Sequence, residues 1–251
     1  PNLDKLAAHG VRFTQFYNAG RCCPTRASLL TGLYSHQTDV GHMVYRNRGP
    51  GRRGRLNQQC VTLGEVLKTA GYRTLMSGKW HVGHQNEEVW PSRRGFDRFY
   101  GIHIHVDSYW KVLRRCPVFE NGKLVIPPTD NPPNRLHPDQ PWYTTDVFTD
   151  HALKFLDEVS QETAPFFLYV AYNAPHWPLE APDEDIRRYH GQYADGWKAV
   201  RQQRFQRMRQ MGLLREEWEL SEDDAPDWNS LSENDRRNAA FRREIYAAQI
   251  D

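Results

Sequence analysis

Residues 20–32 read Gly-Arg-Cys-Cys-Pro-Thr-Arg-Ala-Ser-Leu-Leu-Thr-Gly, and the rest of the chain is arranged around this stretch. A proline suits the first position of a helix, and a glycine often follows the last one. The sequence therefore predicts a short helix that ends at Gly32, with Cys22 and Cys23 at its N-terminus. Free N–H groups there attract anions and help to ionise a thiol, and Arg26 adds positive charge. The pattern is typical of a nucleophile beside an anion-binding pocket. The alternative is a buried cysteine pair that opens an ordinary helix.

The composition is that of a globular protein and excludes several classes of partner. The chain has 251 residues, of which 39% are hydrophobic and 25% are charged, and its net charge is +2. Such a balanced charge gives no electrostatic reason to expect nucleic acid or a membrane surface as a partner. The longest apolar run, residues 166–172, is far shorter than a membrane span requires. Four cysteines are too few for a disulfide scaffold.

Three stretches predict strands, each of which follows a helical pattern, so we expect an α/β fold. The strands are expected at residues 11–17, 72–77 and 166–172, and polar residues follow each of them. Parallel strands place their carboxyl ends at one edge of a sheet, where ligands usually bind. Cations, imidazoles and a helix N-terminus at such an edge would suit a compact anion such as sulfate or phosphate. The candidate site residues are Cys22, Arg26, Lys79, His81, Asn173 and His176.

Each of these groups also has an ordinary explanation when it is taken alone. Lys79 and His81 could belong to a polar loop after a strand, and His176 could merely cap a turn between two prolines. Their joint placement after three strands favours a site over these separate explanations.

Four segments resemble motifs of the sulfatase family, and they occur in the family's order. Residues 22–32 match Cys-x-Pro-Ser/Thr-Arg-x-x-Leu-Leu-Thr-Gly, and residues 71–83 read Gly-Tyr-x-Thr-x-x-x-Gly-Lys-Trp-His-x-Gly. Residues 167–178 resemble the segment that carries a further basic residue of the active site, and residues 193–197 resemble an arylsulfatase-type segment. The resemblance implies an alkaline-phosphatase-like fold, with a mainly parallel sheet that is flanked by helices and incomplete at both ends.

The resemblance also implies how the chain is organised. We expect residues 1–182 to form the α/β core with the active-site motifs, and residues 183–251 to form a charged helical segment of the same catalytic domain. Pro1 leads straight into a helical pattern and Asp251 interrupts another, so we expect an internal piece of a longer protein. A periplasmic or secreted location is expected from the resemblance, although the chain contains no signal peptide.

Carried over by position, the resemblance assigns a role to the residues of the first two motifs. A maturation enzyme would oxidise Cys22 to formylglycine, whose hydrate attacks sulfur and also ligates a metal ion. Arg26 and Lys79 would hold the formylglycine hydroxyls and the sulfate oxygens. His81 would orient the hydrate and help to break the hemiacetal-sulfate intermediate.

The third motif would complete the substrate site. His176 would contact the sulfate and protonate the leaving oxygen, and Lys79 and Asn173 would bind the substrate with it. The reaction would convert a sulfate ester of a small molecule or glycan to an alcohol and inorganic sulfate. Two alternatives stay open: a phosphodiester or phosphonate hydrolase of the same superfamily, and an inactive piece that lacks metal carboxylates.

The metal site is the part that this sequence does not supply. The family uses Ca²⁺, or in some cases Mg²⁺, and takes carboxylates from an Asp-Asp pair that would precede Pro1, so we expect the other ligands outside this chain. Asp150-His151 lies inside an amphipathic helical pattern and Asp223-Asp224 lies outside any strand pattern, so we assign neither pair as ligands. The run from His103 to Asp107 has metal-like alternation, but we interpret it as a substrate-facing loop.

Overall fold

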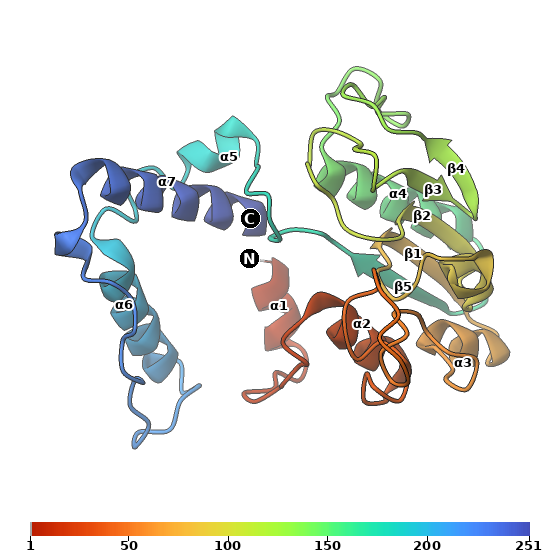
Figure 1. Cartoon of the computed structure of the whole chain (residues 1–251), viewed down its shortest axis with the longest axis horizontal. Helices are drawn as coiled ribbons and strands as arrows, with labels where there is room; N and C mark the ends of the chain where they lie inside the picture. Colours follow the sequence, from red (N-terminus) through yellow and green to blue (C-terminus); the bar gives the residue numbers. More distant parts are fainter. Residues whose placement is uncertain (1) are drawn as a thin grey trace. The chain divides into compact units, whose positions relative to one another are not determined.

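The computed structural model describes residues 2–251 and divides the chain into two compact units (Figure 1). The larger unit comprises Asn18–Glu180. The smaller unit contains the described part of residues 1–17 together with Ala181–Asp251. That the whole chain forms one domain stays a prediction.

The larger unit is built on a five-stranded sheet with the order β4-β3-β2-β1-β5. β1 (Arg73–Lys79) pairs in parallel with β2 (Arg98–Ile102) and with β5 (Phe166–Ala171). β3 (Val118–Glu120) and β4 (Lys123–Ile126) add an antiparallel hairpin to the other edge. The sheet is therefore mainly parallel in its core, as the sequence predicted.

Two details of the strands differ from the sequence-based expectation. The expected strand at residues 11–17 does not form, and these residues are irregular and exposed. A strand needs a neighbour to receive its backbone hydrogen bonds, and none of the described strands pairs with this segment. The strand expected at residues 72–77 instead spans Arg73–Lys79, so Lys79 is the last residue of β1 and does not follow it.

Three helices cover the sheet: α2 (Cys22–Thr31), α3 (Leu63–Thr69) and α4 (Thr144–Val159). Figure 1 shows α2 and α3 on one side of the sheet and α4 on the other. Successive residues of β1 point to opposite faces, so Met76 packs in the cluster that includes α2 while Leu75 packs with α4. β1 is therefore buried on both faces, whereas β5, which the apolar run at residues 166–172 predicted to be covered on both faces, lies at the edge of the sheet and is only partly buried.

Local sequence signals set several of these boundaries. Gly32 adopts a left-handed conformation (φ 71°) after α2, and its N–H donates to the Ser28 carbonyl. Thr62 and Glu65 form the capping box of α3. Pro24 is the third residue of α2 and not the first, because the helix already begins at Cys22. Two short 3₁₀ helices, Glu87–Val89 and Pro91–Arg93, connect β1 to β2.

The smaller unit is helical. It contains α1 (Asn2–Ala8), α5 (Asp183–Arg187), α6 (Gly196–Gln210), a 3₁₀ turn at Trp228–Ser230 and α7 (Glu233–Ile250). α7 packs against both α5 and α6. None of the described helices is both long enough and apolar enough to cross a membrane.

His103 lies inside the larger unit in a stack of aromatic rings. Its ring centroid is 4.2 Å from that of Phe119, 4.5 Å from that of Trp90 and 5.7 Å from that of Phe99. The side chain is 5% exposed, and Nε2 has no hydrogen-bond partner among residues 2–251. Burial lowers the pKa of His103 to about 3, and nearby His84 adds to the effect. His103 is thus a neutral part of the core and does not face a substrate.

This burial predicts acid sensitivity that His103→Phe should reduce. The folded-state pKa lies below the unfolded one, so the unfolded state binds more protons and stability falls as the pH drops below about 6.5. Between pH 6.5 and pH 5 the loss from this residue should be about 2 kcal/mol. Urea unfolding at pH 7 and pH 5 should show a smaller loss in His103→Phe than in the wild type. The half-exposed His137, changed to Phe, serves as the control, and an equal loss in all three proteins would contradict the assignment.

Candidate active site

The N-terminus of α2 presents the two adjacent cysteines differently. Cys22 is the first residue of the helix and is partly exposed, whereas Cys23 is fully buried. Arg21 precedes them in an extended conformation, and its side chain does not cap the helix. The first N–H groups of α2 therefore donate no hydrogen bond to a cap side chain, and Cys22 is the thiol that a ligand can reach.

The surroundings of Cys22 favour its thiolate. The thiol of Cys23 has the largest effect, and His81 and the charge of Lys79 act in the same direction. Together they lower the pKa of Cys22 against the opposing effect of burial. The pKa of Cys23 is raised by Cys22 and by burial, so the shared proton stays on Cys23. The exposed member of the pair is thus the reactive one.

β1 delivers Lys79 and His81 to the same place. Lys79 is 1% exposed and His81 is fully buried. His81 has a positive φ of 61°, and its N–H donates to the His103 carbonyl. Burial lowers the pKa of Lys79 to about 8, with help from the charge of Arg26. Burial likewise lowers the pKa of His81 to about 4, so its imidazole is neutral near pH 7.

Arg26 joins α2 to the ends of two strands. Its guanidinium donates to the Lys79 carbonyl at 2.6 Å, to the Tyr169 hydroxyl at 3.1 Å and to the Tyr172 carbonyl at 3.1 Å. These contacts use the backbone and a side chain of the protein itself. The expected contact of Arg26 with formylglycine and sulfate stays a prediction.

The segment after β5 brings Asn173 and His176 to this edge of the sheet. Asn173 is 5% exposed, its Oδ1 accepts from the Val106 N–H at 3.4 Å, and its Nδ2 has no partner among the described residues. His176 is exposed and donates from Nδ1 to the Trp177 carbonyl at 2.7 Å. Its Nε2 is therefore the nitrogen that can exchange a proton with a ligand.

A third imidazole, His105, links the two predicted histidines. Its ring centroid is 5.9 Å from that of His81 and 5.3 Å from that of His176. A carboxylate oxygen of Asp107 lies 3.8 Å from its Nε2. The Tyr45 hydroxyl lies 3.4 Å from His81 Nε2. In the sequence, His105 is marked only as part of the alternating run from His103 to Asp107, and nothing in the aperiodic loop around Tyr45 marks Tyr45.

The donor atoms near Cys22 do not form a calcium site. Cys22, Cys23 and His81 have ligand atoms that all lie within 4.8 Å of one another, and no other such group of three occurs among residues 2–251. Ca²⁺ prefers six to eight oxygen ligands, whereas this group offers sulfur and nitrogen. His151 stacks on Tyr100 inside the core, which agrees with its exclusion as a ligand.

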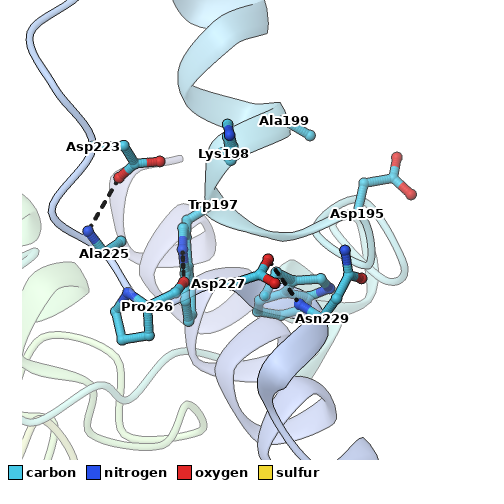
Figure 2. A pocket seen from close by; sticks show the side chains of 10 residues that line it. Asp195, Trp197, Lys198, Ala199, Asp223, Ala225, Pro226, Asp227 and Asn229 are labelled. Atoms are coloured by element: carbon cyan, nitrogen blue, oxygen red, sulfur yellow. Dashed lines mark hydrogen bonds between the residues drawn. The ribbon is translucent and has the colours of Figure 1, made fainter.

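A separate cavity of about 410 Å³ lies in the helical unit (Figure 2). It contains none of the predicted site residues. Trp197 Nε1 donates to the Pro226 carbonyl, while Asp223 and Asp227 accept from N–H groups two residues further along the chain. These carboxylates therefore serve local turns.

The known proteins that match this chain in sequence include sulfatases. The sequence model described as Sulfatase matches residues 1–237. An uncharacterized sulfatase of Schizosaccharomyces pombe is 32% identical over 100% of this chain and 47% of the relative. An arylsulfatase of Klebsiella aerogenes is 30% identical over 100% of this chain and 54% of the relative. The crystal structure of Ps i-CgsB in complex with k-i-k-neocarrahexaose matches with a TM-score of 0.63 and 25% identity, over 100% of this chain and 47% of that one. The chain thus spans about half the length of the curated relatives it matches.

The two basic side chains of the site should have opposite effects on stability. Arg26→Met leaves the carbonyls of Lys79 and Tyr172 without a donor, so it should lower the free energy of unfolding by about 2–3 kcal/mol. Lys79→Met removes a buried ammonium group and should leave the stability unchanged or raise it. Each variant removes one positive charge, so urea unfolding at pH 7 compares a matched pair. Equal destabilisation by both changes would show that the hydrogen bonds of Arg26 to the Lys79 and Tyr172 carbonyls do not stabilise the fold.

Proposed function

The chain belongs to the sulfatase family and has its alkaline-phosphatase-like α/β fold, and we propose that the protein hydrolyses sulfate esters to an alcohol and inorganic sulfate. The nucleophile is a formylglycine that a maturation enzyme makes from Cys22. One observation carries the proposal: Cys22 is the partly exposed member of the cysteine pair, and it lies at a helix N-terminus beside Lys79 and His81.

The chain's own residues can hold a sulfate group at this place. The N-terminus of α2 supplies partial positive charge, and the buried ammonium of Lys79 supplies a full one. Electrostatic attraction is stronger there than in water because the lysine is shielded from solvent. Nδ2 of Asn173, which has no partner within the described part of the chain, can donate to a substrate oxygen.

The two predicted histidines have environments that suit different steps. His81 is buried and neutral, so it can accept a proton from a hydroxyl on residue 22. His176 is exposed at the rim, and its Nε2 is free to protonate the oxygen of the departing alcohol. His105 holds the two rings in one row and is a positioning residue.

Calcium, with magnesium as the alternative, belongs to the proposal through the family, where the ion polarises the ester oxygens. Cys22, once converted to formylglycine, would be one ligand. The other oxygen ligands would come from outside this chain, because the donor set found near Cys22 is not one that calcium prefers.

A sulfated glycan is the substrate class that the chain supports best. A polar cavity of about 530 Å³ lies in the larger unit, where two arginines line it together with several asparagines and glutamines and two carboxylates, one of which, Asp39, pairs with Arg53. The Leu56 N–H donates to the Val82 carbonyl, so this loop lies directly beside the residue after His81. One matched crystal structure holds an oligosaccharide, a neocarrahexaose, and another holds a disulfated glucosamine. We place the protein in the periplasm or outside the cell, as expected for this type of enzyme.

Cys22→Ser should abolish turnover of an aryl sulfate by protein that is co-produced with its maturation enzyme. Cys23→Ala should retain turnover, because Cys23 is buried and is not the proposed nucleophile. Intact-mass analysis should show replacement of one thiol by an aldehyde in the wild type and in Cys23→Ala only. An aryl phosphate diester is the comparison substrate, and faster turnover of the diester would favour the phosphodiesterase alternative. Activity in Cys22→Ser would end the proposal.

His105→Ala should reduce kcat by about 100-fold with a smaller change in KM, because the His81 and His176 rings lose the group between them. His105→Asn should recover part of the loss, since its amide can replace the hydrogen bond that His105 Nδ1 donates to the Val106 carbonyl at 2.7 Å. His137→Ala is the control because His137 is half exposed and pairs with Asp150. A change confined to KM would assign His105 to substrate binding and not to positioning.

A further inference from the structure

Four side chains with soft or borderline donor atoms meet at the N-terminus of α2. Met43 Sδ lies 3.9 Å from Cys22 Sγ and 3.7 Å from Cys23 Sγ. The two thiols and an imidazole nitrogen of His81 all lie within 4.8 Å of one another. His81 is fully buried, and its Nδ1 has no hydrogen-bond partner among the described residues.

These separations are close to those around a metal ion. An ion with tetrahedral bonds of about 2.3 Å keeps its ligand atoms about 3.8 Å apart. The two distances to Met43 agree with that spacing as they stand. The separations among the two thiols and the His81 nitrogen exceed this spacing by at most about 1 Å, a difference that small changes in side-chain torsions can remove.

The donor types select the ion. Thiolate and thioether sulfur are ligands of soft ions, whereas calcium and magnesium take oxygen. The thioether in particular favours copper(I) over zinc. We propose that the protein, while residue 22 is still cysteine, binds one copper(I) ion through Cys22, Cys23, Met43 and His81.

The local charges also suit this complex. Two thiolates and one copper(I) ion together carry one negative charge. Lys79 is buried beside them, and its charge already acts on both Cys22 and Cys23. A buried anionic centre is tolerated when such a cation lies next to it.

Copper binding and conversion to formylglycine would exclude each other. Both use the Sγ atom of Cys22, so a bound ion blocks that thiol from the maturation enzyme. Conversion in turn removes one of the two thiolate ligands. The inference does not depend on the reaction proposed above, because it concerns the protein before its nucleophile is made.

The test uses unconverted protein that is produced without a maturation enzyme and kept free of oxygen with a reductant. Copper(I) is titrated in competition with a coloured copper(I) chelator, and one equivalent should bind. Cys23→Ser and Met43→Leu should each weaken binding by at least about tenfold. Cys60→Ala is the control, since the thiol of this buried cysteine bonds to the Asn57 carbonyl and to Arg94, and it should bind as the wild type does.

Met43→Leu keeps the size of the side chain, so it tests the thioether even if Cys23→Ser does not fold. X-ray absorption at the copper edge should show three sulfur neighbours in the wild type and two in Met43→Leu. The same titration is repeated with zinc, so that the affinities for the two ions can be compared. No competitive binding of copper(I), equal affinity in Met43→Leu, or tighter binding of zinc would each overturn the assignment.

Discussion

The guanidinium of Arg26 fixes the position of α2 against the ends of β1 and β5. It donates to the backbone carbonyls of Lys79 and Tyr172, which follow from two different strands. Because Cys22 lies one helical turn before Arg26, the same contacts place the reactive thiol beside Lys79 and His81. A residue that the family resemblance assigns to ligand binding is therefore also the link between the helix and the sheet. Loss of Arg26 would displace Cys22, the proposed nucleophile precursor, as well as weaken the fold.

Much of the fold could be predicted because local signals and burial agree in these segments. The helix at residues 144–159 has an amphipathic pattern, and the Asn121-Gly122 turn supplies the two positive φ angles that a tight hairpin needs. Residues 11–17 have an alternating pattern that is typical of a strand, but they form no strand. Alternation describes which side chains could be buried, whereas pairing depends on a neighbouring strand that a local pattern cannot reveal.

Much of the candidate site could also be predicted, because the arrangement of the strands determines which residues meet. Lys79, His81, Asn173 and His176 lie at or just beyond the ends of parallel strands, so topology alone brings them together. Tyr45 and Met43 come from a loop without periodicity, and only the folded path of that loop carries them to His81 and the cysteines. His103 and His105 show the limit of a short motif. They are two residues apart, but one lies in an aromatic stack of the core and the other lies at the site.

The adjacent cysteines give the site its chemical character in both of its proposed states. Their closeness makes two simultaneous thiolates unfavourable, so one proton remains on buried Cys23 and the exposed Cys22 carries the charge. An unprotonated, accessible thiol suits both an oxidising maturation step and a soft metal ion. A cation bound to both sulfurs offsets their mutual repulsion, which is why the same pair can act as one nucleophile precursor or as two ligands. Under the two proposals, the chemical state of residue 22 decides whether the site binds copper(I) or a sulfate group.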